Sequence, residues 1–218
     1  MRYYFDFKNI QYKYYQVHQI AEIDGDKIYD LAPYGSIPEV KPANLIDILE
    51  DVKMNAIGKP KNKKECPLSC SWYDNKKNRD KFSIIKKNIN NFVRNIHKVK
   101  SDDVLWTCFK GKEDKKGKHL IYEAIKGDGY TSGFLACNAR ATNKYGDRTK
   151  VAYCVNRFMR TVIKNFFQEN GATVDEGLYA QADMLQFLWR SAIRNDKPIN
   201  IYIPSERMRN LLLKWLAS

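Results

Sequence analysis

The sequence predicts an α/β fold, a mostly parallel sheet with helices on both faces, preceded by a small strand-rich segment. Two observations predict it. From residue 66 onward, short apolar runs alternate with stretches of helical periodicity. Before residue 58, aromatic-rich runs alternate in polarity, and Asp24-Gly25 lies between two of them, which is typical of a β-hairpin. We therefore divide the chain into a strand-rich segment 1–58, a basic linker 59–65 and an α/β domain 66–218.

Apolar periodicity predicts the individual elements. The N-terminal strand candidates are residues 2–7, 12–23 and 27–32, followed by a short amphipathic helix or turn at 44–52. Buried strands are expected at 102–109, 133–138, 150–156 and 199–204. Helices are expected at 81–96, 118–127, 157–171, 177–196 and 205–216. The alternation favours parallel strands, because parallel neighbours need crossover connections that are usually helical.

Charge is concentrated in one region. The 218 residues include 38 Lys and Arg against 25 Asp and Glu, a formal net charge of +13. Residues 59–118, here called the basic segment, hold 18 of the basic and 7 of the acidic residues and therefore carry +11. The lysine-rich runs are residues 59–64, 76–81 and 110–119, and each taken alone is typical of a solvated loop. Together they favour a polyanionic partner, and we expect nucleic acid, DNA in preference to RNA.

The composition also excludes several classes of protein. A hydrophobic fraction of 44% and an aromatic fraction of 13% exclude a disordered or fibrous chain. There is no apolar run long enough to span a membrane and no signal-peptide pattern, so we expect a cytoplasmic protein without a membrane partner. The five cysteines are an odd number, and Cys66 and Cys70 lack a second ligand pair. We therefore expect no metal site, and the adjacent acidic pairs form no nuclease-like motif.

The expected helix 177–196 carries a polar stripe. Gln186, Arg190 and Arg194 are spaced i, i+4 and i+8, so a continuous helix would present all three on one side. Arginine offers a fork of donors that matches phosphate oxygens. Spacing alone leaves open a surface helix whose arginines pair with neighbouring carboxylates.

A polar loop, residues 138–149, is expected to leave the end of the strand 133–138. Its Asn138, Arg140, Thr142 and Asn143 offer amide, hydroxyl and guanidinium donors for phosphate or sugar. Loops at strand carboxyl ends form the binding crevice of α/β sheets. The alternative is a polar turn stabilised by its own side chains.

These motifs in this order resemble the second RecA-like domain of superfamily 2 DEAD/DEAH-box helicases, in the branch carried by phages and plasmids. VLWTCFKG (104–111) resembles the strand of motif IV, and CNARATNKYGDRTKVAYCVN (137–156) resembles motif V. MLQFLWRSAIR (184–194) is similar to motif VI, whose usual form is Q-x-x-G-R-x-x-R, and IYIPSERMRNLL (201–212) has the look of the same branch. The resemblance covers roughly two thirds of the chain, residues 66–218, and implies a RecA-like fold.

The resemblance implies roles for individual residues. Gln186, Arg190 and Arg194 take the catalytic motif VI positions, with Arg190 as the arginine finger on a γ-phosphate. Asn138, Arg140, Thr142 and Asn143, with Thr107 and Lys110, form the implied nucleic-acid and nucleotide-binding set. Two departures weaken the match: Trp189 replaces the glycine before Arg190, and the second arginine comes one residue late.

A complete motor also needs a P-loop, G-x-x-x-x-G-K-[ST], which the sequence lacks. ATP and Mg²⁺ are therefore expected only if a P-loop ATPase domain or chain completes the site, and this chain alone should not hydrolyse ATP. The first hypothesis is the C-terminal half of a helicase or translocase, in the cytoplasm of a bacterial host. The alternative is a stand-alone, non-catalytic phage-type protein that binds nucleic acid or inhibits a partner. A module that docks on an acidic protein is a third.

Overall fold

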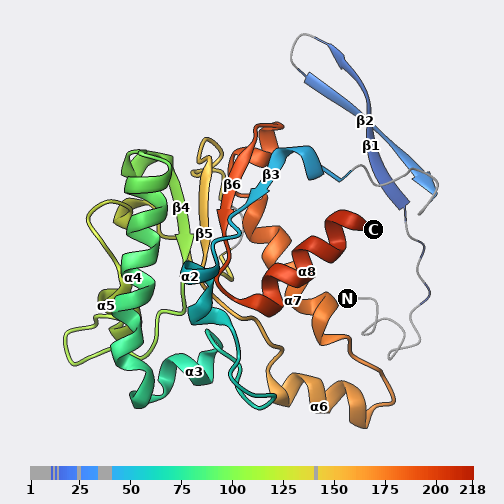
Figure 1. Cartoon of the computed structure of the whole chain (residues 1–218). Coiled ribbons are helices and arrows are strands. Elements are labelled where there is room, and N and C mark those ends of the chain that lie inside the picture. The colour runs from blue at the N-terminus through green and yellow to red at the C-terminus, as the bar shows by residue number, and fades with distance from the viewer. Residues whose placement is uncertain (1–10, 12, 14, 24–25, 34–40, 140–141) are drawn as a thin grey trace. The chain divides into compact units, whose positions relative to one another are not determined.

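The computed structural model describes the chain except residues 1–10, 12, 14, 24–25, 34–40 and 140–141 (Figure 1). It forms two compact units. The smaller unit comprises residues 1–41 and 160–174, and the larger comprises 42–159 and 175–218. This division differs from the expected boundary at 59–65, because residues on both sides of that segment belong to the larger unit.

The smaller unit contains a hairpin and a helix. β1 (Tyr15–Ile23) pairs antiparallel with β2 (Asp26–Pro33), and this confirms the hairpin expected from the alternating polarity of both runs. α6 (Thr161–Glu169) occupies most of the helix expected at 157–171. The strand expected at residues 2–7 lies outside the described residues.

The larger unit is built on a parallel sheet. Among the described residues its strands are β3 (Ile46–Ile48), β4 (Val104–Thr107), β5 (Lys150–Tyr153) and β6 (Ile199–Tyr202). Their order across the sheet is β3-β6-β5-β4, and every neighbouring pair is parallel. The α/β fold with a mostly parallel sheet is therefore confirmed.

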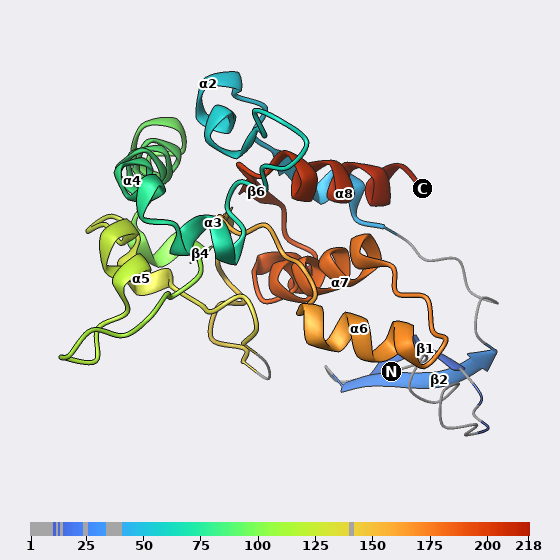
Figure 2. The same ribbon diagram turned by 90° about the horizontal axis from the view of Figure 1, so that it is seen from below.

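Helices cover both faces of this sheet. Alternate residues of a strand point to opposite faces, and in β4 the side chains of Val104 and Trp106 enter one hydrophobic core while Leu105 enters another. The first core includes apolar residues of α4 (Phe82–Asn90) and α5 (Leu120–Ile125), and the second includes those of α7 (Glu176–Leu188) and α8 (Glu206–Ala217). Figure 2 shows the two helix pairs on opposite sides of the strands.

Local sequence explains where several helices begin. Asp51, Ser69, Asp175 and Ser205 are N-caps whose side-chain oxygens each accept the backbone N–H three positions on. They start α2 (Val52–Asn55), α3 (Cys70–Asp74), α7 and α8. Short 3-10 helices include Ala43–Leu45, Ala56–Gly58, Lys76–Lys81, Ser101–Asp103, Thr131–Gly133 and Ala192–Asn195, and α4 continues as a π-helix, Asn91–Ile96.

Two expected elements at the sheet, the runs 133–138 and 44–52, differ in the structure. The run 133–138 is not a buried strand, since Phe134 alone forms a β-bridge, to Trp106. This run lies beside the edge strand β4, and one bridge is too little pairing to add a strand to the sheet. The run 44–52 contains the strand β3 rather than an amphipathic helix, because Ile46 and Ile48 pair with Ile199 and Ile201 of β6. Tertiary pairing overrides local pattern in both places.

Candidate functional site

The two segments singled out by the sequence contact each other. Arg190 Nη1 donates to the carbonyl oxygen of Thr142 at 3.2 Å, and Arg194 Nη1 donates to Asn143 Oδ1 at 2.5 Å. Beside them, Asn195 Nδ2 donates to the carbonyl oxygen of Gly146 at 3.0 Å. Both arginines therefore already have an acceptor from the chain's own loop.

The expected continuous helix 177–196 is wrong. α7 ends at Leu188, and Ser191 is extended (φ −88°, ψ −171°), with its hydroxyl donating to the Leu188 carbonyl at 2.6 Å. The break lets Ala192 donate its N–H to the carbonyl of Arg148 at 2.9 Å and bury its side chain. Gln186 is exposed on α7, whereas Arg190 and Arg194 follow the helix. The three residues do not share one helical stripe.

The expected position of the loop at a carboxyl edge is also wrong for the part around Asn143. The Thr149 N–H donates to the carbonyl of Asp103, one residue before β4 begins, at 3.1 Å. The Arg148 carbonyl accepts the N–H of Ala192, which lies in the segment that precedes β6. These residues lie at the amino ends of the strands, because β5 starts at Lys150 and β6 at Ile199. The ligand crevice of an open parallel sheet forms at the opposite, carboxyl ends.

The other predicted residues are dispersed. Thr107 ends β4 with no exposed surface, so its side chain is not available to nucleic acid. Lys110 and Asn138 are exposed on loops. Arg140 lies outside the described residues. The predicted set thus forms one contact cluster, Thr142 and Asn143 with the two arginines, and not one site.

The carboxyl end of β5 carries polar residues that the sequence reasoning missed. Asn156 is buried; its N–H donates to the Leu68 carbonyl at 2.8 Å, and its Nδ2 donates to the Pro67 carbonyl at 3.1 Å. Arg157 Nε forms an ion pair with Asp183 Oδ2 at 2.6 Å. Burial lowers the pKa of Arg157, but the hydrogen bond and the charge of Asp183, together with Cys137 and Tyr179, outweigh burial, and the net shift of the pKa is upward. The signal was present, since Asn156 and Arg157 directly follow an apolar strand.

Arg207 joins the carboxyl ends of two strands. Its Nη1 donates to the Arg157 carbonyl at 2.7 Å and to Asn156 Oδ1 at 3.1 Å, and its guanidinium lies 4.3 Å from the centre of the Phe158 ring. Burial lowers the pKa of Arg207 from its ordinary value. A pocket of about 460 Å³, lined partly by Cys66, opens beside it. This pocket has the place that the carboxyl-end rule assigns to a ligand.

Two buried hydroxyls lie behind this edge. Thr107 and Tyr153 end neighbouring strands and are paired in register, so their side chains point to the same face. Neither side-chain oxygen forms a hydrogen bond with any residue that the structure describes. Burial raises the pKa of Tyr153 well above its ordinary value, and it raises the pKa of Cys137 as well.

The basic segment presents its charge to solvent. Of its 18 Lys and Arg, Lys81 is half-buried and the others are exposed. Among the described residues, none of the 18 forms an ion pair. Its positive charge is therefore not neutralised by close carboxylates.

Comparison with known proteins identifies the family. Residues 40–216 match the family model of the YonV C-terminal Rossmann-like domain. The chain belongs to this family. A Rossmann-like domain agrees with the parallel sheet of the larger unit. The match begins before Ile46, so β3 belongs to the same domain as the other strands.

One relative shares similarity with the whole chain. The SPbeta prophage-derived uncharacterized protein YonV of Bacillus subtilis (strain 168) is 37% identical over 218 residues. These residues are all of this chain and 49% of that protein, so the chain spans about half the length of its relative. No solved structure matches. The matches show a Rossmann-like domain and give no support for the helicase superfamily.

Three further features of the YonV-type domain concern its cysteines, metal binding and membrane spans. All five cysteines are described and none forms a disulfide, and Cys108 and Cys154 are buried, which raises the pKa of both thiols. Within the described ranges, no group of three His, Cys, Asp or Glu is arranged to hold a metal ion. In the same ranges, no helix has the length and hydropathy needed to cross a bilayer.

Proposed function

We propose that this domain binds nucleic acid, DNA in preference to RNA, through the basic segment. One observation carries the proposal: within the part of the chain that the structure describes, 18 Lys and Arg of one segment have no carboxylate partner within 4.0 Å. Exposed lysines and arginines that pair with their own carboxylates have little attraction left for phosphates. Unpaired ones can replace the counterions condensed on DNA, and this release drives binding.

The test is a salt titration. Fluorescence anisotropy of a labelled 30-base-pair DNA is measured with the 218-residue chain between 50 and 200 mM NaCl. We expect log K to fall linearly with log salt, with a slope of about −0.9 for each phosphate contacted. A single-stranded DNA and an RNA duplex of the same length report the preference. No binding at 50 mM NaCl, or binding that salt does not weaken, would reject the proposal.

A second candidate function, the C-terminal half of an ATP-dependent helicase or translocase, is favoured by one specific observation. The segments that resemble motifs V and VI contact each other through Arg190 with Thr142 and Arg194 with Asn143. In such a motor ATP and Mg²⁺ would be held by a P-loop domain outside this chain, and Arg190 would stabilise the transferred phosphoryl group.

This candidate is tested with an enzyme reconstituted from this chain and a P-loop domain supplied on another polypeptide. Arg190→Ala and Arg194→Ala should each lower ATP turnover by about 10³-fold or more while the domain stays folded. Equal turnover in both variants and the unmodified enzyme would exclude the arginine-finger role.

A further inference from the structure

We infer that the phosphate backbone of a DNA duplex lies in a groove between α4 and the turn Gly127–Tyr130. The inference rests on the proposed function and says where on the basic segment the contact is made. A pocket of about 470 Å³ is lined by Lys86, Lys87 and Arg94 on the α4 side and by the residues of this turn. A second pocket of about 600 Å³ shares Lys86 and Asp128 with the first, so the two are neighbours, and together they are called the groove.

The groove is positively charged on balance. Lys86, Lys87 and Arg94 are exposed and form no ion pair with any described residue. Lys126 in the second pocket is neutralised by Glu123 at 2.9 Å. Asp128 is the remaining carboxylate on the lining. Three uncompensated cations therefore face one carboxylate, which suits a polyanion.

A glycine shapes the floor of the groove. A Cβ on Gly129 would lie 2.6 Å from Arg94 Nε and 3.3 Å from Asn90 Oδ1. The absence of a side chain thus lets the Arg94 guanidinium lie across the turn. In that position its donors line the same pocket as those of Lys86 and Lys87, and a phosphate in the pocket can contact all three side chains.

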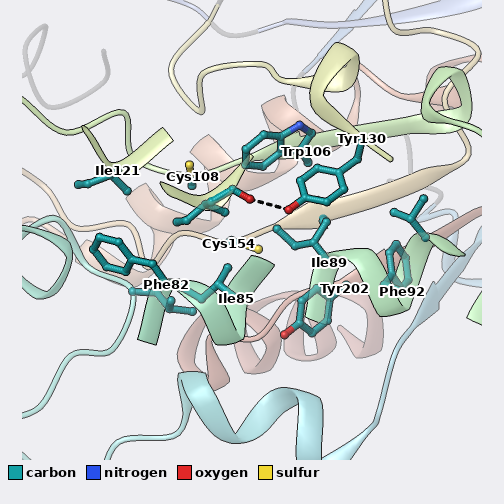
Figure 3. Packing of buried hydrophobic residues seen from close by; sticks show 14 of the residues in the cluster. Phe82, Ile85, Ile89, Phe92, Trp106, Cys108, Ile121, Tyr130, Cys154 and Tyr202 are labelled. Carbon is teal, nitrogen blue, oxygen red and sulfur yellow. Dashed lines mark hydrogen bonds between the residues drawn. The ribbon is translucent and has the colours of Figure 1, made fainter. Parts of the chain in front are cut away.

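The turn itself is held rigidly. The N–H groups of Tyr130 and Thr131 both donate to the Gly127 carbonyl at 3.0 Å, and the Tyr130 hydroxyl donates to the Ile125 carbonyl at 2.5 Å. The Tyr130 ring has no exposed surface and packs edge-on against Trp106, 5.1 Å between centroids (Figure 3). The backbone of the turn is therefore preformed, and binding needs to order only the exposed lysine and arginine side chains.

The burial of the Tyr130 ring favours a duplex over a single strand as the ligand of the groove. Proteins that bind single strands stack the bases on exposed aromatic rings. Tyr130 is the one aromatic residue that lines either pocket, and its ring is buried in the core. What the groove offers is cationic side chains and peptide groups, which contact phosphate and carry no base specificity.

The experiment compares two triple variants with equal charge change in the same anisotropy titration. Lys86→Gln/Lys87→Gln/Arg94→Gln empties the groove of its unpaired cations, and Lys13→Gln/Lys53→Gln/Lys197→Gln is the control, at three exposed lysines outside the basic segment. The groove variant should weaken duplex binding about 10²-fold at 100 mM NaCl and make the salt slope shallower by about 3, because three phosphate contacts are lost. The control should stay within about threefold of the unmodified chain.

A variant of opposite sign keeps the inference falsifiable if the triple variant fails to fold. Asp128→Asn removes the carboxylate from the groove and should tighten duplex binding about two- to fivefold at 100 mM NaCl. If the unmodified chain does not bind DNA, the proposed function fails. If it binds and the two triple variants weaken binding equally, or Asp128→Asn has no effect, the groove is the wrong place while the proposed function stands.

Discussion

The hydroxyl of Tyr153 offers a direct test of the described core. It is fully buried between the sheet and α7, where the ring packs on Phe187 at 5.4 Å, and it makes no hydrogen bond to a described residue. A buried hydroxyl without a partner costs about 1–3 kcal/mol in desolvation. Tyr153→Phe removes that cost and keeps the ring, so we expect the free energy of unfolding to rise by about 1 kcal/mol.

A matched control is available in the other core. The Tyr73 hydroxyl is also buried but donates to the Cys154 carbonyl at 2.7 Å. Tyr73→Phe removes this bond and leaves a buried carbonyl with one acceptor position unused, so it should destabilise by about 1 kcal/mol. The same chemical change is thus expected to have opposite signs at the two positions.

The assay is urea unfolding followed by far-UV circular dichroism, with the midpoint and the slope fitted separately. A gain of 1 kcal/mol corresponds to a rise of about 2–4 °C in Tm for a chain of this size. Burial raises the pKa of Tyr153 well above its ordinary value, so the hydroxyl stays neutral and pH does not confound the comparison. If Tyr153→Phe destabilises as much as Tyr73→Phe, the hydroxyl has a partner and the reasoning is refuted.

Three other predictions concern stability. Burial lowers the pKa of His97 below its ordinary 6.5; the unfolded chain then binds the proton more tightly, so stability is complete above pH 6.5 and falls below it. His97→Gln should flatten this pH dependence of the unfolding midpoint, and an unchanged profile would contradict it. A Cβ on Gly58 would lie 1.9 Å from the Pro204 carbonyl, so Gly58→Ala should lower the urea midpoint by the equivalent of about 1–3 kcal/mol, and an unaltered midpoint would show that the packing is looser. Asp183→Asn removes the charged acceptor 2.6 Å from Arg157 and should cost about 1–3 kcal/mol at pH 7, with Asp196→Asn, an exposed carboxylate, as the neutral control.

Much of the α/β domain could be predicted from local pattern. The runs that became β4, β5 and β6 are short and apolar, and a sheet covered on both faces requires such runs. The helical periodicity of residues 81–96 predicted α4, and that of residues 205–216 predicted α8. These features depend on periodicity and capping, which act within a few residues of the chain.

The candidate site was predicted less well. The sequence linked Arg190 and Arg194 by helical spacing, whereas the structure brings them to Thr142 and Asn143 after the helix has ended. Both arginines still lie at one place, because each binds a neighbouring residue of the same loop, Thr142 or Asn143. The sequence placed the binding loop at the carboxyl end of the run 133–138, but this run forms a single β-bridge and is not a strand of the sheet. Arg157, which follows the true strand β5, was therefore not predicted.

By itself the sequence determined the class of fold, the location of most helices and strands, and the concentration of +11 in residues 59–118. Only the tertiary structure decided that Ile46–Ile48 joins the sheet, that α7 stops at Leu188, and that Arg94 lies across Gly129. The physical reason is range. Periodicity, caps and charge are properties of neighbouring residues, whereas strand pairing, helix termination against a loop and the lining of a groove depend on residues far apart in the chain.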